Sequence, residues 1–195
     1  MPEDRGASVT PGVFFAVVGA SGVGKDTVLT GTQKSLSGNT AFRFPQRYIT
    51  RPRDAGGEDH IAVSEPDFRH MQASNGFCLS WSAHQLHYGL SRNLIADLRY
   101  GTHLVCNVSR TSLSEAKSVF ERLQIIEITA DPDTIAARLK SRGRESDADV
   151  AARQARQVAD WRAGHGVHTV CNDGTAQDAI ASMTGLLLRL SAQSV

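Results

Sequence analysis

Residues 13–27 read VFFAVVGASGVGKDT, and this stretch decides the fold. Residues 13–18 form a short run of β-branched and aromatic residues ended by glycine, which is typical of a strand buried on both faces of a sheet. Residues 19–25 match the pattern GxxxxGK, and a helix is predicted over 26–36. A glycine-rich turn between strand and helix presents inward N–H groups and the positive end of the helix dipole, so it predicts a phosphate-binding loop rather than a simple turn.

The loop and the first helical turn supply the residues expected to bind the polyphosphate of ATP. These residues are Gly19, Ala20, Ser21, Gly22, Val23, Gly24, Lys25, Asp26 and Thr27. Lys25 is expected to reach the β- and γ-phosphates and to take part in catalysis. A Ser or Thr hydroxyl normally binds Mg²⁺ at the next position, where this chain has Asp26, and a carboxylate is also a hard oxygen ligand. We therefore predict that Asp26 binds Mg²⁺; the alternatives are the Thr27 hydroxyl as ligand, or an Asp26 that only complements the helix dipole.

Strand and helix patterns alternate along the rest of the chain. Further strands are predicted over 42–50, 77–81, 103–108, 124–129 and 168–171, and helices over 64–74, 91–100, 113–123, 131–141, 147–161 and 177–190. Ser64 and Ser91 are the expected N-caps of their helices. Such alternation predicts an α/β fold with a parallel central sheet between two helical layers, as in P-loop NTPases. Residues 1–12 are expected to be a flexible tail, and 13–195 a single domain.

The composition restricts the class of protein. The chain has 195 residues, 41% of them hydrophobic and 21% charged, as in ordinary globular domains. Since 21 Lys and Arg against 20 Asp and Glu leave a net charge of +1, nothing favours nucleic acid or an anionic membrane as partner. Cys78, Cys106 and Cys171 each lie in an apolar run and are expected to be reduced core thiols of a cytoplasmic protein. No apolar run is long enough for a membrane span, and the first residues lack the layout of a secretory signal.

Arginines gather around a Pro/Gly-rich loop in the first half of the chain. Arg47, Arg51 and Arg53 flank this loop, and because a guanidinium can grip phosphate with two hydrogen bonds, they are expected to bind the phosphate of an acceptor. Tyr88 is expected to set its phenol against a phosphate; the alternative is a half-buried tyrosine whose hydroxyl is satisfied within the protein. Residues from about 42 to 90 are therefore expected to form a small acceptor-binding subdomain.

A second group of arginines predicts a lid. Arg138, Arg142 and Arg144 lie at the end of a predicted helix and beside a glycine, a composition that suits a mobile segment over about 138–156. We expect these arginines to neutralise the transferring phosphoryl group and to act in catalysis. The alternative for them is that they complement the dipole at the end of that helix.

Polar residues follow the strand predicted over 103–108. Asn107, Ser109 and Arg110 lie where α/β folds place ligand contacts, so they are expected to bind sugar or phosphate; the alternative is that they only shape the turn. Three histidines without the spacing of a zinc site are expected to line a polar pocket: His60, His84 and His87.

The order of these motifs resembles that of the guanylate kinase family. In that family a phosphate loop, an Arg-rich loop, a Tyr-Gly segment and an Arg-containing lid follow one another; here they are GASGVGKD, TRPRDAGGED, HYGLS and RLKSRGRE, within about residues 13–190. Within this superfamily the chain most resembles the ribose 1,5-bisphosphate phosphokinases. The specific marks are GKD in place of GKS or GKT, RYITRP at 47–52, HIAVSE at 60–65, LSW at 79–81 and NVSR at 107–110.

The resemblance implies an enzyme with ATP and Mg²⁺ that converts ribose 1,5-bisphosphate to 5-phosphoribosyl 1-diphosphate in the phosphonate catabolism of the bacterial cytoplasm. Guanylate kinases carry a base-reading glutamate where this chain has residues 79–81, and acids where it has 106–109. Losing such hydrogen-bonding groups costs orders of magnitude in discrimination, so GMP is the less expected acceptor. The alternatives are a guanylate kinase or another nucleoside monophosphate kinase, and an inactive guanylate kinase-like binding module, against which the intact loop glycines and Lys25 argue. The expected partner is a small phosphorylated sugar, and the sequence is compatible with a homodimer.

Overall fold

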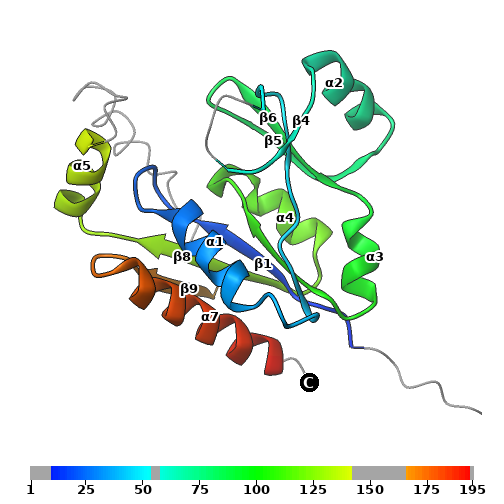
Figure 1. Cartoon of the computed structure of the whole chain (residues 1–195). Helices are drawn as coiled ribbons and strands as arrows, with labels where there is room; N and C mark the ends of the chain where they lie inside the picture. Colours follow the sequence, from blue (N-terminus) through cyan, green and yellow to red (C-terminus); the bar gives the residue numbers. More distant parts are fainter. Residues whose placement is uncertain (1–9, 54–57, 142–165, 194–195) are drawn as a thin grey trace, which may run out of the picture.

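The computed structural model describes residues 10–53, 58–141 and 166–193 (Figure 1). The strands are β1 (Phe14–Val18), β2 (Phe42–Arg43), β3 (Tyr48–Ile49), β4 (Ile61–Ala62), β5 (Phe77–Ala83), β6 (Leu86–Ser91), β7 (His103–Asn107), β8 (Leu123–Thr129) and β9 (Val167–Cys171). The helices are α1 (Lys25–Ser35), α2 (Glu65–Ala73), α3 (Leu94–Arg99), α4 (Leu113–Val119), α5 (Pro132–Ser141) and α7 (Ala176–Ala192), with a 3₁₀ turn at Arg110–Ser112.

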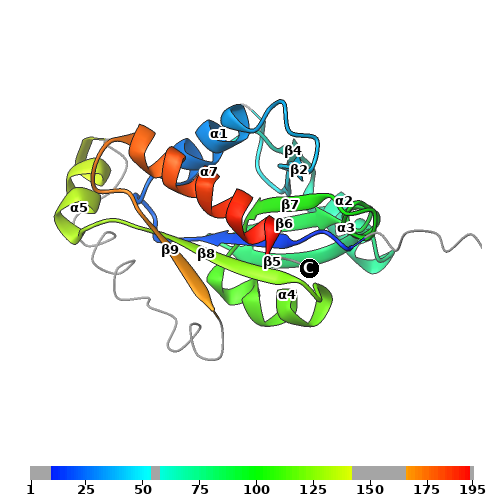
Figure 2. The ribbon, with the colours of Figure 1, turned by 90° about the horizontal axis from the view of Figure 1, so that it is seen from below.

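The central sheet has five strands in the order β2-β7-β1-β8-β9, and every neighbouring pair is parallel. Its middle strand β1 is buried along its whole length. Helices α1 and α7 cover one face of the sheet, and α3 and α4 lie on the other (Figures 1 and 2). The three-layer α/β/α architecture predicted from the sequence is therefore confirmed.

The alternation of side chains along β1 builds two cores at once. Phe15 and Val17 pack on the α1/α7 face, in a cluster that includes Met183. Phe14 and Ala16 point to the opposite face and pack with residues of α3 and α4. Because successive side chains of a strand point to opposite faces, a strand with helices on both sides has to be apolar throughout.

A second, four-stranded sheet has the order β4-β3-β6-β5 and includes the segments that the sequence assigns to the acceptor. The single strand predicted over 42–50 is wrong, because β2 pairs with the central sheet and β3 with the small one. Pro45, which has no N–H to donate to a ladder, lies in the break between them. The sequence also gave no sign of β6, which follows β5 through a turn with positive φ at His84 (52°) and Gln85 (62°), without the usual glycine.

Two predicted helix starts have different outcomes. Ser64 caps α2 as expected, and its Oγ accepts a hydrogen bond from the N–H of Asp67 at 3.2 Å. Ser91 as a cap is wrong: it still belongs to β6, so the N-cap of α3 is Asn93. The helix predicted over 147–161 lies outside the described residues.

The cysteines are free thiols, as expected, but only two of them are core residues. Cys78 and Cys106 are buried, whereas Cys171 is exposed, which corrects the prediction for this residue. Cys171 ends β9, an edge strand of the central sheet, and its Sγ lies 2.7 Å from the carboxylate of Asp173. In the described part of the chain no helix is both long and apolar enough to cross a bilayer.

The stacked pair of Phe14 and Phe120 gives a direct test of the α3/α4 core, since the ring centroids are 3.8 Å apart and the planes are nearly parallel. We expect Phe14→Ala to lower the free energy of unfolding by about 3–5 kcal/mol, because it removes a fully buried ring and leaves a cavity. Urea unfolding monitored by circular dichroism measures this loss. Tyr100→Ala is the control, because Tyr100 is 80% exposed and its removal should change stability by no more than about 0.5 kcal/mol. Equal losses in the two variants would contradict the assignment.

Candidate active site

The loop between β1 and α1 has the conformation expected of a phosphate-binding loop. Gly24 is the N-cap of α1 in the left-handed region, with φ of 86°, and Gly22 also has a positive φ of 84°. A Cβ on Gly19 would lie 2.5 Å from the carbonyl oxygen of Ile128, so the loop also passes too close to β8 for a side chain at that position. Glycine is therefore required by backbone conformation at one end of the loop and by lack of space at the other.

Lys25 curls back over this loop. Its Nζ donates hydrogen bonds to the carbonyl oxygens of Gly19 at 2.8 Å and of Ala20 at 3.1 Å. Burial of the ammonium group lowers the pKa of Lys25 to about 8, against the raising effect of Asp26; the positive charges of Arg110 and Arg47 also lower it. A triphosphate placed in the loop would oppose this shift, because an adjacent anion favours the charged form of the lysine.

The loop is braced from the side of the C-terminal strand. Asn172 directly follows β9, is almost fully buried, and donates from Nδ2 to the carbonyl oxygen of Val23 at 2.6 Å. Arg138 of α5 reaches the same carbonyl at 3.5 Å. A Cβ on Gly24 would lie 2.6 Å from the Asn172 Nδ2, so the brace also limits that position to glycine. Asn172 was not among the predicted site residues, although it follows a parallel strand, as Asn107 does.

Asp26 and Asn107 come together across the site from α1 and the end of β7. The Nδ2 of Asn107 donates to the Asp26 carboxylate at 3.4 Å. Thr27 is exposed on α1. Ser109 acts as the cap of the 3₁₀ turn, since its Oγ accepts from the N–H of Thr111 at 3.3 Å. This contact supports the alternative of a turn-shaping serine, and a ligand role for Ser109 stays a prediction.

Arg110 is held by a buried carboxylate. Its guanidinium donates to Glu127 at 2.8 Å, and Glu127 is only 2% exposed because it lies on β8, inside the central sheet. The β8 partner of Val18, the last residue of β1, is Glu127, so this pair sits directly beside the start of the phosphate loop. Glu127 was also missed, although one charged residue within an otherwise apolar strand is the usual sign of a paired, buried charge.

Arg47 is enclosed by aromatic rings in the small sheet. Trp81 of β5 and Tyr88 of β6 stack with planes 4° apart and centroids at 5.5 Å, and the Arg47 guanidinium lies 5.0 Å from the centre of the Tyr88 ring. The same guanidinium forms an ion pair with Glu58. Burial raises the pKa of Tyr88, against the lowering effect of Arg47, so its phenol stays protonated at neutral pH. Tyr88 therefore serves at least as a platform for a cation.

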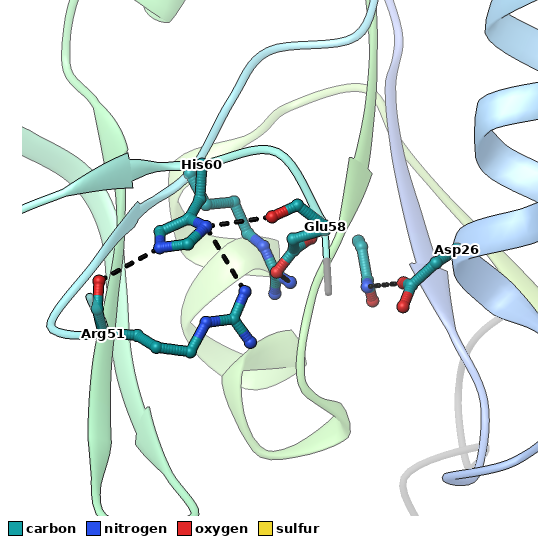
Figure 3. A network of polar contacts seen from close by, with 6 residues as sticks. Asp26, Arg51, Glu58 and His60 are labelled. Carbon is teal, nitrogen blue, oxygen red and sulfur yellow. Dashed lines mark hydrogen bonds and ion pairs between the residues drawn. The ribbon is translucent and has the colours of Figure 1, made fainter. Parts of the chain in front are cut away.

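Arg51 and Glu58 are linked by His60, as Figure 3 shows. The ring of His60 is almost fully buried; its Nε2 lies 3.1 Å from the carbonyl oxygen of Arg51, and its Nδ1 lies 2.9 Å from that of Glu58. The Arg51 guanidinium reaches the same Nδ1 at 3.3 Å. His60 thus lies within hydrogen-bonding distance of the backbone on both sides of the loop, and as a neutral imidazole it can donate to one of the two carbonyls. Its place in the lining of a polar pocket stays a prediction.

A pocket of about 150 Å³ lies between α1 and this loop. Its lining side chains include Asp26, Arg47, Glu58 and Asn107, so it lies between the first turn of α1 and the arginine that packs on Tyr88. A larger pocket of about 470 Å³ lies on the far side of Arg51. Arg47, a cation that suits an anion, therefore faces a pocket at the carboxyl end of β7, beside the phosphate loop, where α/β folds bind ligands.

The remaining predicted site residues have mixed outcomes. Arg53 is exposed on the loop, His87 lines the larger pocket, and His84 lies in the turn between β5 and β6. Arg142 and Arg144, with most of the predicted lid over 138–156, lie outside the described residues. Their roles stay predictions.

Comparison with solved structures defines the class of fold. A guanylate kinase from Anaplasma phagocytophilum is similar with a TM-score of 0.68 at 15% identity, over 92% of this chain and 86% of that one. A gluconokinase from Sinorhizobium meliloti gives a TM-score of 0.54 at 17% identity, over 94% and 95% of the two chains. The fold is therefore that of the guanylate kinase-like P-loop kinases.

Comparison with curated proteins defines the family. A ribose 1,5-bisphosphate phosphokinase from Rhizobium etli is 38% identical over 188 residues, which cover 96% of this chain and 95% of that protein. One from Agrobacterium fabrum is 40% identical over 166 residues, 85% of this chain and 91% of the relative. No protein-family model matches the chain. The chain belongs to the ribose 1,5-bisphosphate phosphokinase family, and the resemblance drawn from its motifs is confirmed.

The lowered pKa of Lys25 predicts that nucleotide binding depends on pH. Without nucleotide the lysine loses its proton as the pH rises through about 8, and a bound triphosphate favours the protonated form. Affinity for ATP should therefore fall above this pH, and binding at pH 8.5 should be accompanied by proton uptake. Calorimetry in two buffers with different ionisation enthalpies measures the uptake. Lys25→Met should abolish it, whereas Lys34→Met, a change at an exposed lysine of the same helix, should leave it intact; uptake that survives in Lys25→Met would contradict the assignment.

Proposed function

We propose that this chain transfers the γ-phosphoryl group of ATP to the 1-phosphate of ribose 1,5-bisphosphate, giving 5-phosphoribosyl 1-diphosphate and ADP. In this reaction a 1-phosphate oxygen forms a bond to the γ-phosphorus, the bond from that phosphorus to the β,γ-bridging oxygen breaks, and ADP leaves. One observation carries the proposal: an arginine-containing pocket begins at Asp26, directly after the phosphate loop, in a chain 38–40% identical to kinases of that name.

The polyphosphate of ATP is assigned to the loop of residues 19–25 and to Lys25. The turn that Gly22 and Gly24 make possible is the kind that gathers N–H groups around phosphate oxygens, and the N-terminus of α1 adds its dipole. Lys25 already lies across the loop, so a small movement of its side chain would exchange carbonyl oxygens for phosphate oxygens. Arg138, fixed near Val23, is assigned to the same end of the nucleotide.

Mg²⁺ fits the donor set at the end of β7. The carboxylate of Asp26 supplies hard oxygen ligands beside the loop, and Asn107 holds it from the end of β7 through Nδ2 at 3.4 Å. Among the described residues, no group of three or more His, Cys, Asp or Glu could hold a metal ion. This suits Mg²⁺, which proteins usually hold with one or two carboxylates while nucleotide phosphates and water complete its shell. When bound, the ion would offset charge on the phosphates; Asp26 would orient it.

The acceptor needs positioning more than chemical activation. A phosphate is already ionised at neutral pH, so no general base is required, and catalysis rests on alignment and on neutralising charge. We assign this task to Arg47, which lines the pocket, together with Arg51 and Arg110. The same proposal places the reaction in phosphonate breakdown in the cytoplasm.

Acceptor choice is the direct test of this function. With ATP, the protein should turn over ribose 1,5-bisphosphate with kcat/KM at least roughly a hundredfold above that for GMP or AMP, because the site lacks the acids that read a purine. Coupled ADP release measures the rates, and phosphorus NMR should show a new diphosphate signal. Lys25→Ala, checked for folding by circular dichroism, is expected to be inactive. A preference for GMP would replace the proposal with guanylate kinase activity.

Substitutions at Asp26 test the metal assignment. Asp26→Asn should raise the Mg²⁺ concentration for half-maximal rate by roughly tenfold or more, because an amide is a weaker ligand than a carboxylate. Asp26→Ser, which restores the hydroxyl usual at this position, should be less impaired. Magnesium titrations of the initial rate measure both. If Thr27→Ala has the large effect and Asp26→Asn does not, the hydroxyl is the ligand instead.

A further inference from the structure

Arg47 carries a charge that the protein encloses before any ligand arrives. Its side chain is only 10% exposed, and the guanidinium lies over Tyr88 at 5.0 Å and Trp81 at 5.7 Å. The Nε of Arg47 is buried and, within the described residues, has no hydrogen-bond partner. Since a guanidinium stays charged at any relevant pH, an anion has to be supplied at this place.

In this structure Glu58 supplies that anion. Its carboxylate pairs with Arg47, while its backbone carbonyl lies apart from this pair, 2.9 Å from the Nδ1 of His60. The neighbouring acid, Asp59, is used differently, because it accepts a hydrogen bond from the neutral amide of Gln46 at 2.6 Å. The Glu58 side chain can therefore leave Arg47 by rotating its own bonds, while its backbone stays beside the buried ring of His60.

Both members of this pair line the pocket that faces Asp26, so an incoming anion meets them directly. A phosphate carries more negative charge than a carboxylate and offers three oxygens to the planar fork of a guanidinium. A phosphate and the Glu58 carboxylate on one enclosed guanidinium would repel each other. One anion must therefore replace the other.

The Arg110–Glu127 pair shows the contrast. Glu127 is 2% exposed within the central sheet, whereas the side chain of Glu58 is 22% exposed at the pocket. The carboxylate of Glu127 is enclosed and acts as a permanent partner of Arg110. The carboxylate of Glu58 can move into solvent through the pocket.

We infer that Glu58 is a displaceable counter-ion: its carboxylate occupies the place on Arg47 that one phosphate of the acceptor takes, and acceptor binding exchanges the first anion for the second. The inference rests on the proposed function for the identity of the acceptor. It makes Glu58 a specificity-determining residue, because an acceptor without an anion at this place leaves Glu58 in the pocket and gains nothing from Arg47.

Glu58→Gln is the decisive variant. It keeps the size of the side chain and removes the competing charge, so KM for ribose 1,5-bisphosphate should fall about three- to tenfold, with kcat within about twofold of the wild type. Arg47→Gln should raise KM by roughly tenfold or more. In the Arg47→Gln background, Glu58→Gln should have no further effect, because there is no cation left to compete for.

Asp97→Asn is the matched control. It breaks another arginine–carboxylate pair, with Arg43, on the far side of β2, and should leave KM unchanged. Glu58→Asp, with a shorter side chain, gives a second variant should Glu58→Gln fail to fold, and it should also lower KM. A KM that rises or stays constant in a folded Glu58 variant overturns the inference, because it would mean that Glu58 positions Arg47 rather than competes for it.

A second measurement does not depend on the identity of the acceptor. Calorimetry with inorganic phosphate on ADP-saturated protein should show tighter binding in Glu58→Gln than in the wild type, and weaker binding in Arg47→Gln. If the three proteins bind phosphate in this order but the wild type does not phosphorylate ribose 1,5-bisphosphate, the proposed function alone is refuted. Turnover of that substrate without the Glu58 effect would refute the counter-ion inference alone.

Discussion

The close packing of the turn between β1 and α1 is the constraint on which the rest of the site depends. The turn is fixed on one side by β8, which leaves no room for a side chain at Gly19, and on the other by Asn172, which holds the carbonyl of Val23. A loop held at both ends keeps its conformation when charge enters it. Preorganised N–H groups stabilise anions without further rearrangement, and this is the source of their effect in phosphoryl transfer.

The site also concentrates positive charge, and the protein balances it in two ways. Lys25, Arg110 and Arg47 are close enough for the two arginines to help lower the pKa of the lysine. Arg110 has a permanent partner in the buried Glu127, whereas the partner of Arg47 stands at the mouth of a pocket. A protein that binds two phosphorylated ligands needs buried cations, and these need counter-ions when the ligands are absent. Glu127 and Glu58 provide those counter-ions, the first permanently and the second at the pocket.

Sequence reasoning was strongest where a local pattern has one physical meaning. The buried run of β1, the helix that follows the glycine-rich loop, and the Ser64 cap of α2 were all predicted correctly. The predictions failed where the role of a residue depends on a partner that is distant in the sequence. Residues 42–50 looked like one strand, since nothing local shows that β2 and β3 pair with different sheets. The turn at His84 and Gln85 lacks glycine, so no turn signal in the sequence marked the start of β6.

The amino-acid sequence by itself determined the class of fold, the phosphate loop and the family, because these follow from short-range order: apolar runs, glycine spacing and a sequence of motifs. Only the tertiary structure decided which charges meet. Glu58, Glu127 and Asn172 attracted no attention in the sequence, and each acquires its role from a partner at least eleven residues away. Coulomb forces and hydrogen bonds act over a few ångströms of space, and the folding of the chain, not its order, sets those distances.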